Sequence, residues 1–298
     1  MGHAHARPGA HRARLLAVLL LTAAVSLAQV VGGLLTGSLA LVADAAHGLT
    51  DATGLGLALM AATLATRPAT SRRSYGWLRA EALAALVNGL LVSGLAAWVL
   101  WEAVRRWNDP VEIDGGPMIA VACLGVAANA AGLVILRPAA HTSLNLRGAH
   151  LEVLGDLLGS LAVVVAGVVV VTTGWTRADV AASVAIGVLI LPRALVLLRD
   201  VADVLLEAVP PGVDLEEVRG RLLQVAGVVD VHDLHAWTIG TGVPALTAHV
   251  TVADEDPPYD GQLLDRLQEC VRTGFGIDHA TFQIEPEGHR GHEPEGHA

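Results

Sequence analysis

The chain has 298 residues, of which 53% are hydrophobic and only 16% charged, and its formal net charge at pH 7 is −10. This composition excludes an ordinary soluble domain of this length, and the negative charge argues against nucleic acid as a partner. Cys123 and Cys270 lie far apart, so the two cysteines form neither a disulfide framework nor a C-x-x-C metal motif. The composition therefore favours a protein embedded in the lipid bilayer.

Six apolar stretches are long enough to cross a bilayer, which requires about 20 helical residues. They cover residues 15–36, 39–66, 79–104, 117–136, 147–172 and 179–198. Ser26-Leu27-Ala28 resembles a signal-cleavage site, but the apolar run continues beyond it and five more stretches follow. We therefore predict a six-helix transmembrane domain over residues 15–204, preceded by a histidine-containing tail at residues 1–14.

The arginines indicate the orientation of the spans, because cytoplasmic loops of membrane proteins are enriched in basic residues. If the N-terminus is cytoplasmic, the outer side holds only Arg177, with Arg105 and Arg106 at the edge of an acidic loop. We therefore expect a multi-pass protein of the inner (plasma) membrane with both termini in the cytoplasm. The arginines then assigned to the inner side are Arg7, Arg12, Arg14, Arg67, Arg72, Arg73, Arg137, Arg147 and Arg199.

From about residue 205 the pattern changes to that of a small soluble fold. Residues 214–217 resemble a capping box that opens a helix ending at Gly227. Strands at 228–239 and 245–252, a helix near 260–273 and a strand at 279–285 follow. We predict a cytoplasmic α+β domain of order αββαβ over residues 205–286, and a second histidine-containing tail at residues 287–298.

Ionisable side chains within the spans are the strongest functional signal, because each costs roughly 2.5–3.5 kcal/mol on insertion scales. His47 and Asp51 are four residues apart in the second span, and Glu152 and Asp156 repeat this spacing in the fifth. Residues four apart lie on one helix face. Two such pairs on facing helices could enclose a metal ion in the tetrahedral geometry of zinc. Alternatively, these groups bond helices together or line a water cavity.

Other polar residues in the spans have weaker signals. Asp44 lies one turn before His47 on the same face and is a candidate for an access group or a support for the ligands. His150 lies about 200° around the helix from Glu152 and points elsewhere. The amides in spans one, three and four are expected to form interhelical hydrogen bonds rather than to bind metal. These amides are Gln29, Asn88 and Asn129.

A short internal repeat links the two ligand-bearing spans. The pattern His47-x-Leu-x-Asp51-x-x-Gly54 matches Glu152-x-Leu-x-Asp156-x-x-Gly159. Because three spans separate the copies, the two helices run in opposite directions, which suits transport by alternating access.

Four stretches resemble the signature sequences of the cation diffusion facilitator family of metal–proton antiporters. They are residues 37–51 in the second span, 75–89 at the start of the third, 145–156 in the fifth, and 232–239 in the soluble domain. The resemblance covers residues 12–286. It implies a homodimeric secondary transporter, not an enzyme, that exports zinc or a related metal in exchange for protons. It also implies that the αββαβ domain is metallochaperone-like.

Carried over by position, the resemblance implies a transport site formed by His47, Asp51, Glu152 and Asp156. Zinc-transporting relatives usually carry histidine where this chain has Glu152. One histidine with three carboxylates gives a charge of −3, one more than a divalent ion neutralises. Glu152 therefore either keeps a proton when metal is bound or favours harder ions such as manganese, cobalt or iron. Zinc remains the first expectation because His47 is retained.

The resemblance implies a mechanism in which cytoplasmic metal displaces protons from His47 and a carboxylate. The helices then rock to expose the site outward, where protons reload the ligands and release the ion. Histidine suits the role of proton carrier, because its side chain titrates near neutral pH.

A regulatory metal site that stabilises the dimer is expected in the soluble domain, with ligands drawn from His232, His235, His249 and Glu285. A simpler interpretation is that His235 and Trp237 pack at a hairpin. The tail histidines either capture metal weakly or are solvated. They are His3, His5, His11, His289, His292 and His297.

Other functions are less well supported by the sequence. An intramembrane metal hydrolase would need a general base and an open coordination position, and the spans contain no H-E-x-x-H motif. A passive channel would conduct metal independently of a pH gradient. A membrane-anchored metal sensor would survive loss of Asp51. Within the transporter interpretation, the same fold could prefer cadmium, cobalt, manganese or iron over zinc.

Overall fold

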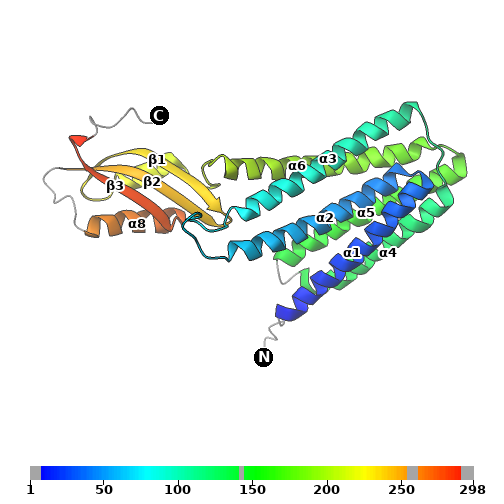
Figure 1. The fold of residues 1–298 in the computed structure, drawn as a ribbon, viewed down its shortest axis with the longest axis horizontal. Helices are drawn as coiled ribbons and strands as arrows, with labels where there is room; N and C mark the ends of the chain where they lie inside the picture. Colours follow the sequence, from blue (N-terminus) through cyan, green and yellow to red (C-terminus); the bar gives the residue numbers. More distant parts are fainter. Residues whose placement is uncertain (1–7, 141–143, 254–260, 290–298) are drawn as a thin grey trace. The chain divides into compact units, whose positions relative to one another are not determined.

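The computed structural model describes residues 8–140, 144–253 and 261–289, and their side chains over residues 18–137, 150–253 and 262–289. Six helices long and apolar enough to cross a membrane precede a small αββαβ fold (Figure 1). This confirms the predicted fold class. The six helices are α1 Pro8–Thr36, α2 Leu39–Ala65, α3 Ala80–Asn108, α4 Gly115–Ala140, α5 Leu144–Thr173 and α6 Arg177–Leu205.

The structure differs from the prediction at the N-terminal tail. Helix α1 already begins at Pro8, within the tail expected at residues 1–14. Proline is well suited to a first helical turn, because its missing N–H would have no partner there. Residues 1–7 and 290–298, with most of the tail histidines, lie outside the described residues, as does the side chain of His11.

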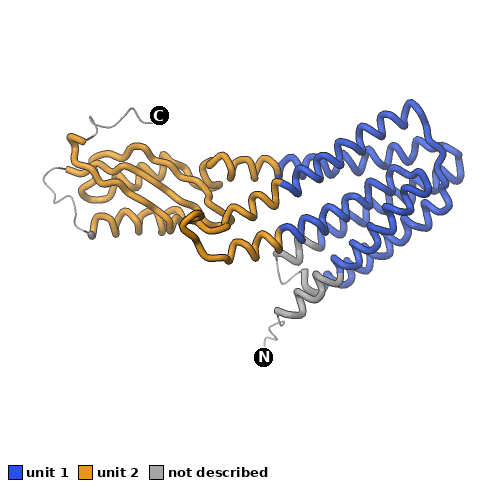
Figure 2. Tube along the Cα trace, viewed as in Figure 1, with its two compact units in different colours: residues 1–57, 87–197 blue, residues 58–86, 198–298 orange. Residues whose placement is uncertain are grey.

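The chain divides into two compact units (Figure 2). Unit 1 comprises residues 1–57 and 87–197, and unit 2 comprises residues 58–86 and 198–298. The six long helices therefore contribute most of their length to unit 1. The αββαβ fold belongs entirely to unit 2.

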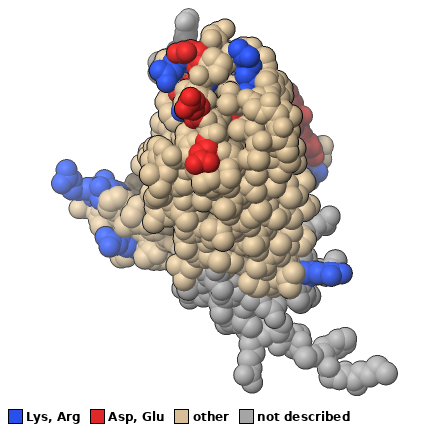
Figure 3. Space-filling model, turned by 90° about the vertical axis from the view of Figure 1, so that its right-hand side faces the viewer, with Lys and Arg blue, Asp and Glu red and all other residues tan. Residues whose placement is uncertain are grey.

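Unit 1 has an apolar core and an apolar exterior. Leu41, Met118 and Val163 are buried side chains of its core cluster. Leu35 and Val134, by contrast, are 82% and 71% exposed. On the face of the molecule in Figure 3, uncharged residues form a broad surface that few charged side chains interrupt. Exposed apolar surface of this extent is what a helix bundle presents to lipid.

The start of α2 is held by a carboxylate from α6. Asp179 is fully buried and accepts hydrogen bonds from the backbone N–H groups of Leu39 (2.8 Å) and Ala40 (3.2 Å) and from the Ser38 hydroxyl. The first N–H groups of a helix have no partner within the helix. Asp179 therefore caps α2 across the bundle and keeps its first turn next to α6.

Unit 2 contains a three-stranded sheet in the order β1-β2-β3. Strand β2 pairs antiparallel with β1 and parallel with β3. The two helices contribute Val218, Leu222, Leu267 and Val271 to a core shared with the strands. This confirms the predicted αββαβ order. Its elements are α7 Leu215–Leu222, β1 Val228–Gly240, β2 Val243–Val252, α8 Gly261–Phe275 and β3 His279–Pro286.

Helix α7 is shorter than the sequence predicts. Asp214 is its N-cap, as expected, and accepts a hydrogen bond of 2.9 Å from the Glu216 N–H. The helix ends at Leu222, not at Gly227. Beyond Leu222, the N–H groups of Gln224 and Val225 each bond to the carbonyl three residues earlier. These are tight turns rather than further α-helical turns, so the helix ends before the glycine that the sequence suggested.

Candidate metal centres

Three of the four predicted transport ligands lie together inside unit 1. His47 on α2 faces Asp51 one turn further along the same helix, with 3.6 Å between Nδ1 and Oδ2. Its Nε2 lies 3.4 Å from Oδ1 of Asp156 on α5. One ligand atom from each of the three residues lies within 4.8 Å of the others. The structure therefore brings α2 and α5 together at the residues that the sequence singled out.

One nitrogen of His47 and one oxygen from each carboxylate lie within 4.8 Å of one another, close enough to surround a metal ion after small side-chain shifts. Zinc lies about 2.0–2.2 Å from nitrogen and oxygen ligands, which places neighbouring ligands of a tetrahedron about 3.3–3.6 Å apart. Nδ1 of His47, Oδ2 of Asp51 and Oδ1 of Asp156 are all buried and lack a hydrogen-bond partner. Buried polar atoms without partners are rare and costly. Three of them in one cluster make these residues a candidate cation site.

Glu152 lies outside this cluster. It is exposed, yet it is close enough to interact electrostatically with both Asp51 and Asp156. Side-chain exposure falls from 27% at Asp51 to 19% at His47 and 11% at Asp156. Among these four residues, exposure is thus greatest at Glu152 and least at Asp156.

A buried hydrogen-bond network lies one turn beyond the ligands. The Asp44 carboxylate on α2 accepts hydrogen bonds from the Gln29 amide on α1 (2.8 Å) and from the Ser160 hydroxyl on α5 (2.7 Å). The Asn129 amide on α4 donates to Ser160 at 3.3 Å. Gly125 permits this approach, because a β-carbon there would clash with the Gln29 amide. Four helices are thereby joined around Asp44.

The prediction that the amides in the spans form interhelical hydrogen bonds is confirmed for two of the three. Gln29 and Asn129 form interhelical hydrogen bonds, as predicted. Oδ1 of Asn88 is buried without a partner, so the structure does not show such a bond for this atom. A cavity of about 10 Å³, at the lower limit for one water molecule, is lined by Gln29, Asp44, Asn129 and Asp156 among others. Asp44 therefore supports the ligand helices, one of the two roles predicted for it.

A second cluster lies on the sheet of unit 2. Glu285 on β3 is 3.0 Å from Nδ1 of His249 on β2 and 3.6 Å from Nε2 of His232 on β1. His232 and His249 are direct partners across the β1–β2 ladder, with ring centroids 5.3 Å apart. Three candidate ligands from three strands thus meet on one face of the sheet.

His235, the fourth predicted ligand in this domain, is not part of the cluster. The four residues of β1 from His232 to His235 oppose only three of β2, from His249 to Thr247, which marks a β-bulge. Asp233 within it has φ of 46°. The bulge leaves His235 half exposed, with its Nε2 2.9 Å from the Asp233 carboxylate. Asp233 also approaches His249 at 3.7 Å, so it borders the cluster.

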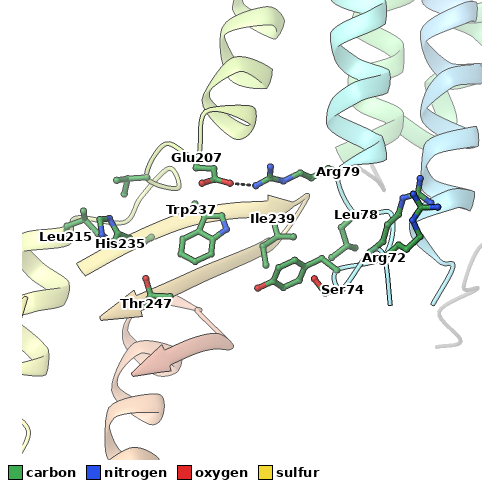
Figure 4. A pocket seen from close by; sticks show the side chains of 15 residues that line it. Arg72, Ser74, Leu78, Arg79, Glu207, Leu215, His235, Trp237, Ile239 and Thr247 are labelled. Atoms are coloured by element: carbon green, nitrogen blue, oxygen red, sulfur yellow. Dashed lines mark hydrogen bonds and ion pairs between the residues drawn. The ribbon is translucent and has the colours of Figure 1, made fainter. Parts of the chain in front are cut away.

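A cavity in unit 2 has a different character from the two clusters. It measures about 750 Å³, and His235, Trp237 and Tyr75 are among its lining residues. Figure 4 shows the one carboxylate among these residues, Glu207, directed at Arg79, with 2.7 Å between them. His235 and Trp237 therefore share a cavity, while the three clustered candidate ligands of this unit lie elsewhere on its sheet.

Sequence reasoning missed two residues near the transport cluster. Ser160 carries little signal of its own, but it lies one turn after Asp156 on α5. Arg193 lies within α6, where Nη1 comes within 3.9 Å of the position that a β-carbon on Gly155 would occupy. Arg193 could have been identified from the sequence, because it is a charged residue inside the sixth apolar stretch. His150, expected to point away from the ligands, is not part of the cluster.

Comparison with known proteins places these features in a family. Residues 15–206 match the cation efflux transmembrane domain, and residues 210–287 match the cytoplasmic domain of cation efflux proteins. The metal cation efflux system protein CzcD of Cupriavidus metallidurans is 42% identical over 284 residues, covering 95% of this chain and 90% of that protein. The zinc transporter ZitB of Escherichia coli K12 is 40% identical over 294 residues, covering 96% and 93%.

More distant relatives and one solved structure are also similar. A cadmium, cobalt and zinc/H(+)-K(+) antiporter of Bacillus velezensis is 32% identical, covering 97% of this chain and 93% of that protein. The solved metal-bound C-terminal domain of the CzcD transporter from Cupriavidus metallidurans is 37% identical and covers 24% of this chain and 99% of that one, with a TM-score of 0.23. With both of its parts matched and full-length relatives at about 40% identity, this chain belongs to the cation efflux (cation diffusion facilitator) family of transporters.

Proposed function

We propose that this protein exports zinc from the cytoplasm in exchange for protons, using His47, Asp51, Glu152 and Asp156 as its transport site. The observation that carries the proposal is the convergence of three buried, unpartnered ligand atoms from His47, Asp51 and Asp156. The names of relatives support the choice of substrate, since they include zinc transporters and an antiporter of cadmium, cobalt and zinc.

The exposure of the ligands supports entry of metal from the cytoplasm. The soluble domain of this family is cytoplasmic, so with six spans α2 begins on the outer side and α5 ends there. Exposure decreases from Asp51 to Asp156, and Asp156 is followed outward by the Ser160–Asp44 bond. This gradient of exposure along the site supports entry of metal from the inside.

Proton exchange follows from the chemistry of the ligands. A metal ion binds neutral imidazole and ionised carboxylates, so loading releases any protons that these groups carry. In the proposed cycle His47 and a carboxylate lose protons when zinc binds. After the helices rock and the site opens outward, protons from that side return to the same groups and release the ion.

The wider assignments follow the same reasoning. We place the protein in the inner (plasma) membrane with both termini in the cytoplasm, in agreement with the distribution of arginines. We further propose that it is a homodimer, because the family that matches residues 210–287 is named for dimerisation. Cross-linking of the protein in membranes, followed by mass determination in detergent, tests the dimer. A monomer in both measurements would contradict it.

Because Glu152 adds a third carboxylate to the proposed site, the protein could prefer either zinc or harder ions such as manganese. The test is transport by purified protein in proteoliposomes, with metal and internal pH read together. Zinc, cadmium, cobalt, manganese and iron are compared in the parent and in Glu152→His. The same metal order and pH profile in both would show that Glu152 does not influence selectivity.

The central test uses the same proteoliposomes with Asp51→Ala as the inactive variant. Asp109→Ala, an exposed residue of the loop before α4, is the matched control. We expect zinc flux coupled to proton movement in the parent and the control, and none in Asp51→Ala. Zinc flux without proton movement would refute antiport. Full metal responses in Asp51→Ala would instead favour a membrane-anchored sensor.

We also propose that His232, His249 and Glu285 bind a regulatory metal ion in the cytoplasmic domain. Zinc added to the full-length protein should raise its unfolding temperature in detergent, because a ligand that binds only the folded state stabilises it. His249→Ala should lose most of this increase. His235→Ala should keep it, because His235 lies outside the cluster. The opposite ranking of the two variants would refute the assignment.

A further inference from the structure

The cavity of about 750 Å³ in unit 2 is lined by residues next to the ends of membrane spans. They come from the segment between α2 and α3, from the segment after α6, and from α7, β1 and β2. Arg79 immediately precedes α3, and Glu207 follows the last residue of α6 by two positions. Because the chain has six spans and a cytoplasmic soluble domain, these ends lie on the cytoplasmic side. The cavity therefore includes residues near the level of the lipid headgroups of the inner leaflet.

The lining of this cavity is positively charged, although the whole chain carries −10. It contains three arginines, Arg72, Arg73 and Arg79, and a single carboxylate, Glu207. Glu207 is already paired with Arg79, at 2.7 Å, and Figure 4 shows Arg72 well apart from it. Among the described residues, neither Arg72 nor Arg73 belongs to an ion pair. Two cations of the lining thus have no negative partner in the described part of the chain.

Both arginines can reach a ligand. They are exposed, and the Arg73 guanidinium lies over the Trp77 ring, 3.8 Å from its centroid. Stacking on a ring restricts the plane of a guanidinium but leaves the N–H donors at its edge free to bind. Paired N–H donors of this kind match the oxygens of a phosphate group. Ser74 and Tyr75, which also line the cavity, carry hydroxyl groups that can donate as well.

Contacts within unit 2 keep the segment that carries the arginines against the sheet. The Tyr75 hydroxyl lies 3.4 Å from Nε2 of His279 at the start of β3, and the two rings meet edge to face. A β-carbon on Gly240, the last residue of β1, would lie only 2.9 Å from the carbonyl oxygen of Leu78. The absence of a side chain at Gly240 therefore allows the backbone to approach β1 closely. The cavity is thus formed without a ligand, and its volume is typical of sites for small molecules.

We propose that this cavity binds a phosphate ester, and that Arg72 and Arg73 hold its oxygens. Its location favours the headgroup of an anionic phospholipid, because the cytoplasmic leaflet is negatively charged and attracts basic residues next to the spans. Trp237, which lines the cavity, suits this position, since tryptophan combines an apolar ring with a polar N–H. A soluble phosphate ester is the other source of the same chemistry. The cavity shares no residue with either metal cluster, so the proposal is independent of the transport function.

The test measures ligand binding to the full-length protein in detergent without added metal. Native mass spectrometry gives the affinities for phosphatidylglycerol and for phosphatidylcholine with the same acyl chains. Calorimetry with glycerol 3-phosphate measures binding of a soluble ester. The variants are Arg72→Gln, Arg73→Gln and the two combined. Arg67→Gln is the matched control, because Arg67 is exposed in the same segment between α2 and α3 but does not line the cavity. Thermal unfolding without lipid shows that each variant is folded.

The parent should bind phosphatidylglycerol more tightly than phosphatidylcholine. One arginine near the membrane surface strengthens the attraction to anionic lipid about five-fold. Each single variant should therefore lose about five-fold in affinity for phosphatidylglycerol, and the combined variant roughly 25-fold. Arg67→Gln should bind as the parent does. High salt should weaken binding by the parent more than binding by the combined variant, because the variant has fewer charges to screen.

Three results would overturn the proposal. The first is parent-like binding in the combined variant. The second is an equal loss in Arg67→Gln, since the general charge of the membrane-facing segment would then explain the binding. The third is a parent that neither prefers phosphatidylglycerol nor binds glycerol 3-phosphate. If the parent binds glycerol 3-phosphate without any lipid preference, and the combined variant loses this binding, the site is supported and its ligand is a soluble phosphate ester.

Discussion

The hydrogen bond between Ser160 and Asp44 connects the two helices that carry the proposed transport ligands. Asp44 lies one turn before His47 on α2, and Ser160 lies one turn after Asp156 on α5. Both side chains are buried. We predict that Ser160→Ala destabilises the transmembrane bundle, because it removes one of the two donors to the Asp44 carboxylate and the acceptor of the Asn129 amide.

The size of this effect follows from the environment of the bond. Interhelical hydrogen bonds in membrane proteins contribute about 0.6 kcal/mol on average and up to about 1.7, because the unfolded chain in the membrane also finds partners. The Ser160–Asp44 distance is short, at 2.7 Å, and its acceptor is a carboxylate. We therefore expect about 1–1.7 kcal/mol, or roughly a 5- to 16-fold change in the unfolding equilibrium constant. Asp44→Ala should cost more, because it orphans the donors of Gln29 and Ser160 together.

Unfolding by titration with SDS in mixed micelles measures these differences. Ser183→Ala is the matched control, because Ser183 is equally buried but donates within its own helix, to the Asp179 carbonyl. The cycle of Ser160→Ala, Asp44→Ala and the double variant should show a coupling of about 1 kcal/mol. Additive single effects, or a loss in Ser183→Ala as large as in Ser160→Ala, would refute the idea of a specific bond between the ligand helices.

Three further predictions concern other parts of the fold. Asp179→Ala should destabilise the protein by about 2 kcal/mol, the upper end of the range for a lost N-cap, as measured by thermal unfolding; a smaller loss in Asp179→Asn should follow from its remaining acceptor. Leu267→Ala should destabilise unit 2 by about 2–5 kcal/mol, because Leu267 is fully buried, and limited proteolysis of the full chain should detect the loosened domain; resistance equal to that of the parent would contradict the assigned core. Burial raises the pKa of the Cys270 thiol, so at a given pH the folded protein holds less of the reactive thiolate. In a Cys123→Ala background, Cys270 should therefore react more slowly with maleimide at pH 8 than the same thiol after unfolding in SDS, and equal rates would contradict this.

Much of this protein is determined locally by its sequence. A run of about 20 apolar residues can satisfy its backbone in lipid only as a helix, so the six spans were predictable to within a few residues at most ends. The four-residue spacing of His47 and Asp51 places both on one face because helical periodicity depends only on the chain itself. The αββαβ order likewise followed from alternating patterns and turn residues in the last third.

The tertiary structure decided which of these residues meet. Glu152 and Asp156 lie on one face of α5, so which of them lies beside His47 depends on the position of α5 along its axis relative to α2. The hydrogen bond between Asp44 and Ser160 helps to fix that position, and no local pattern encodes it. The bulge at Asp233 similarly excludes His235 from the cluster on the sheet. Periodicity is a property of one helix or strand, whereas a site with ligands from several elements is a property of their packing.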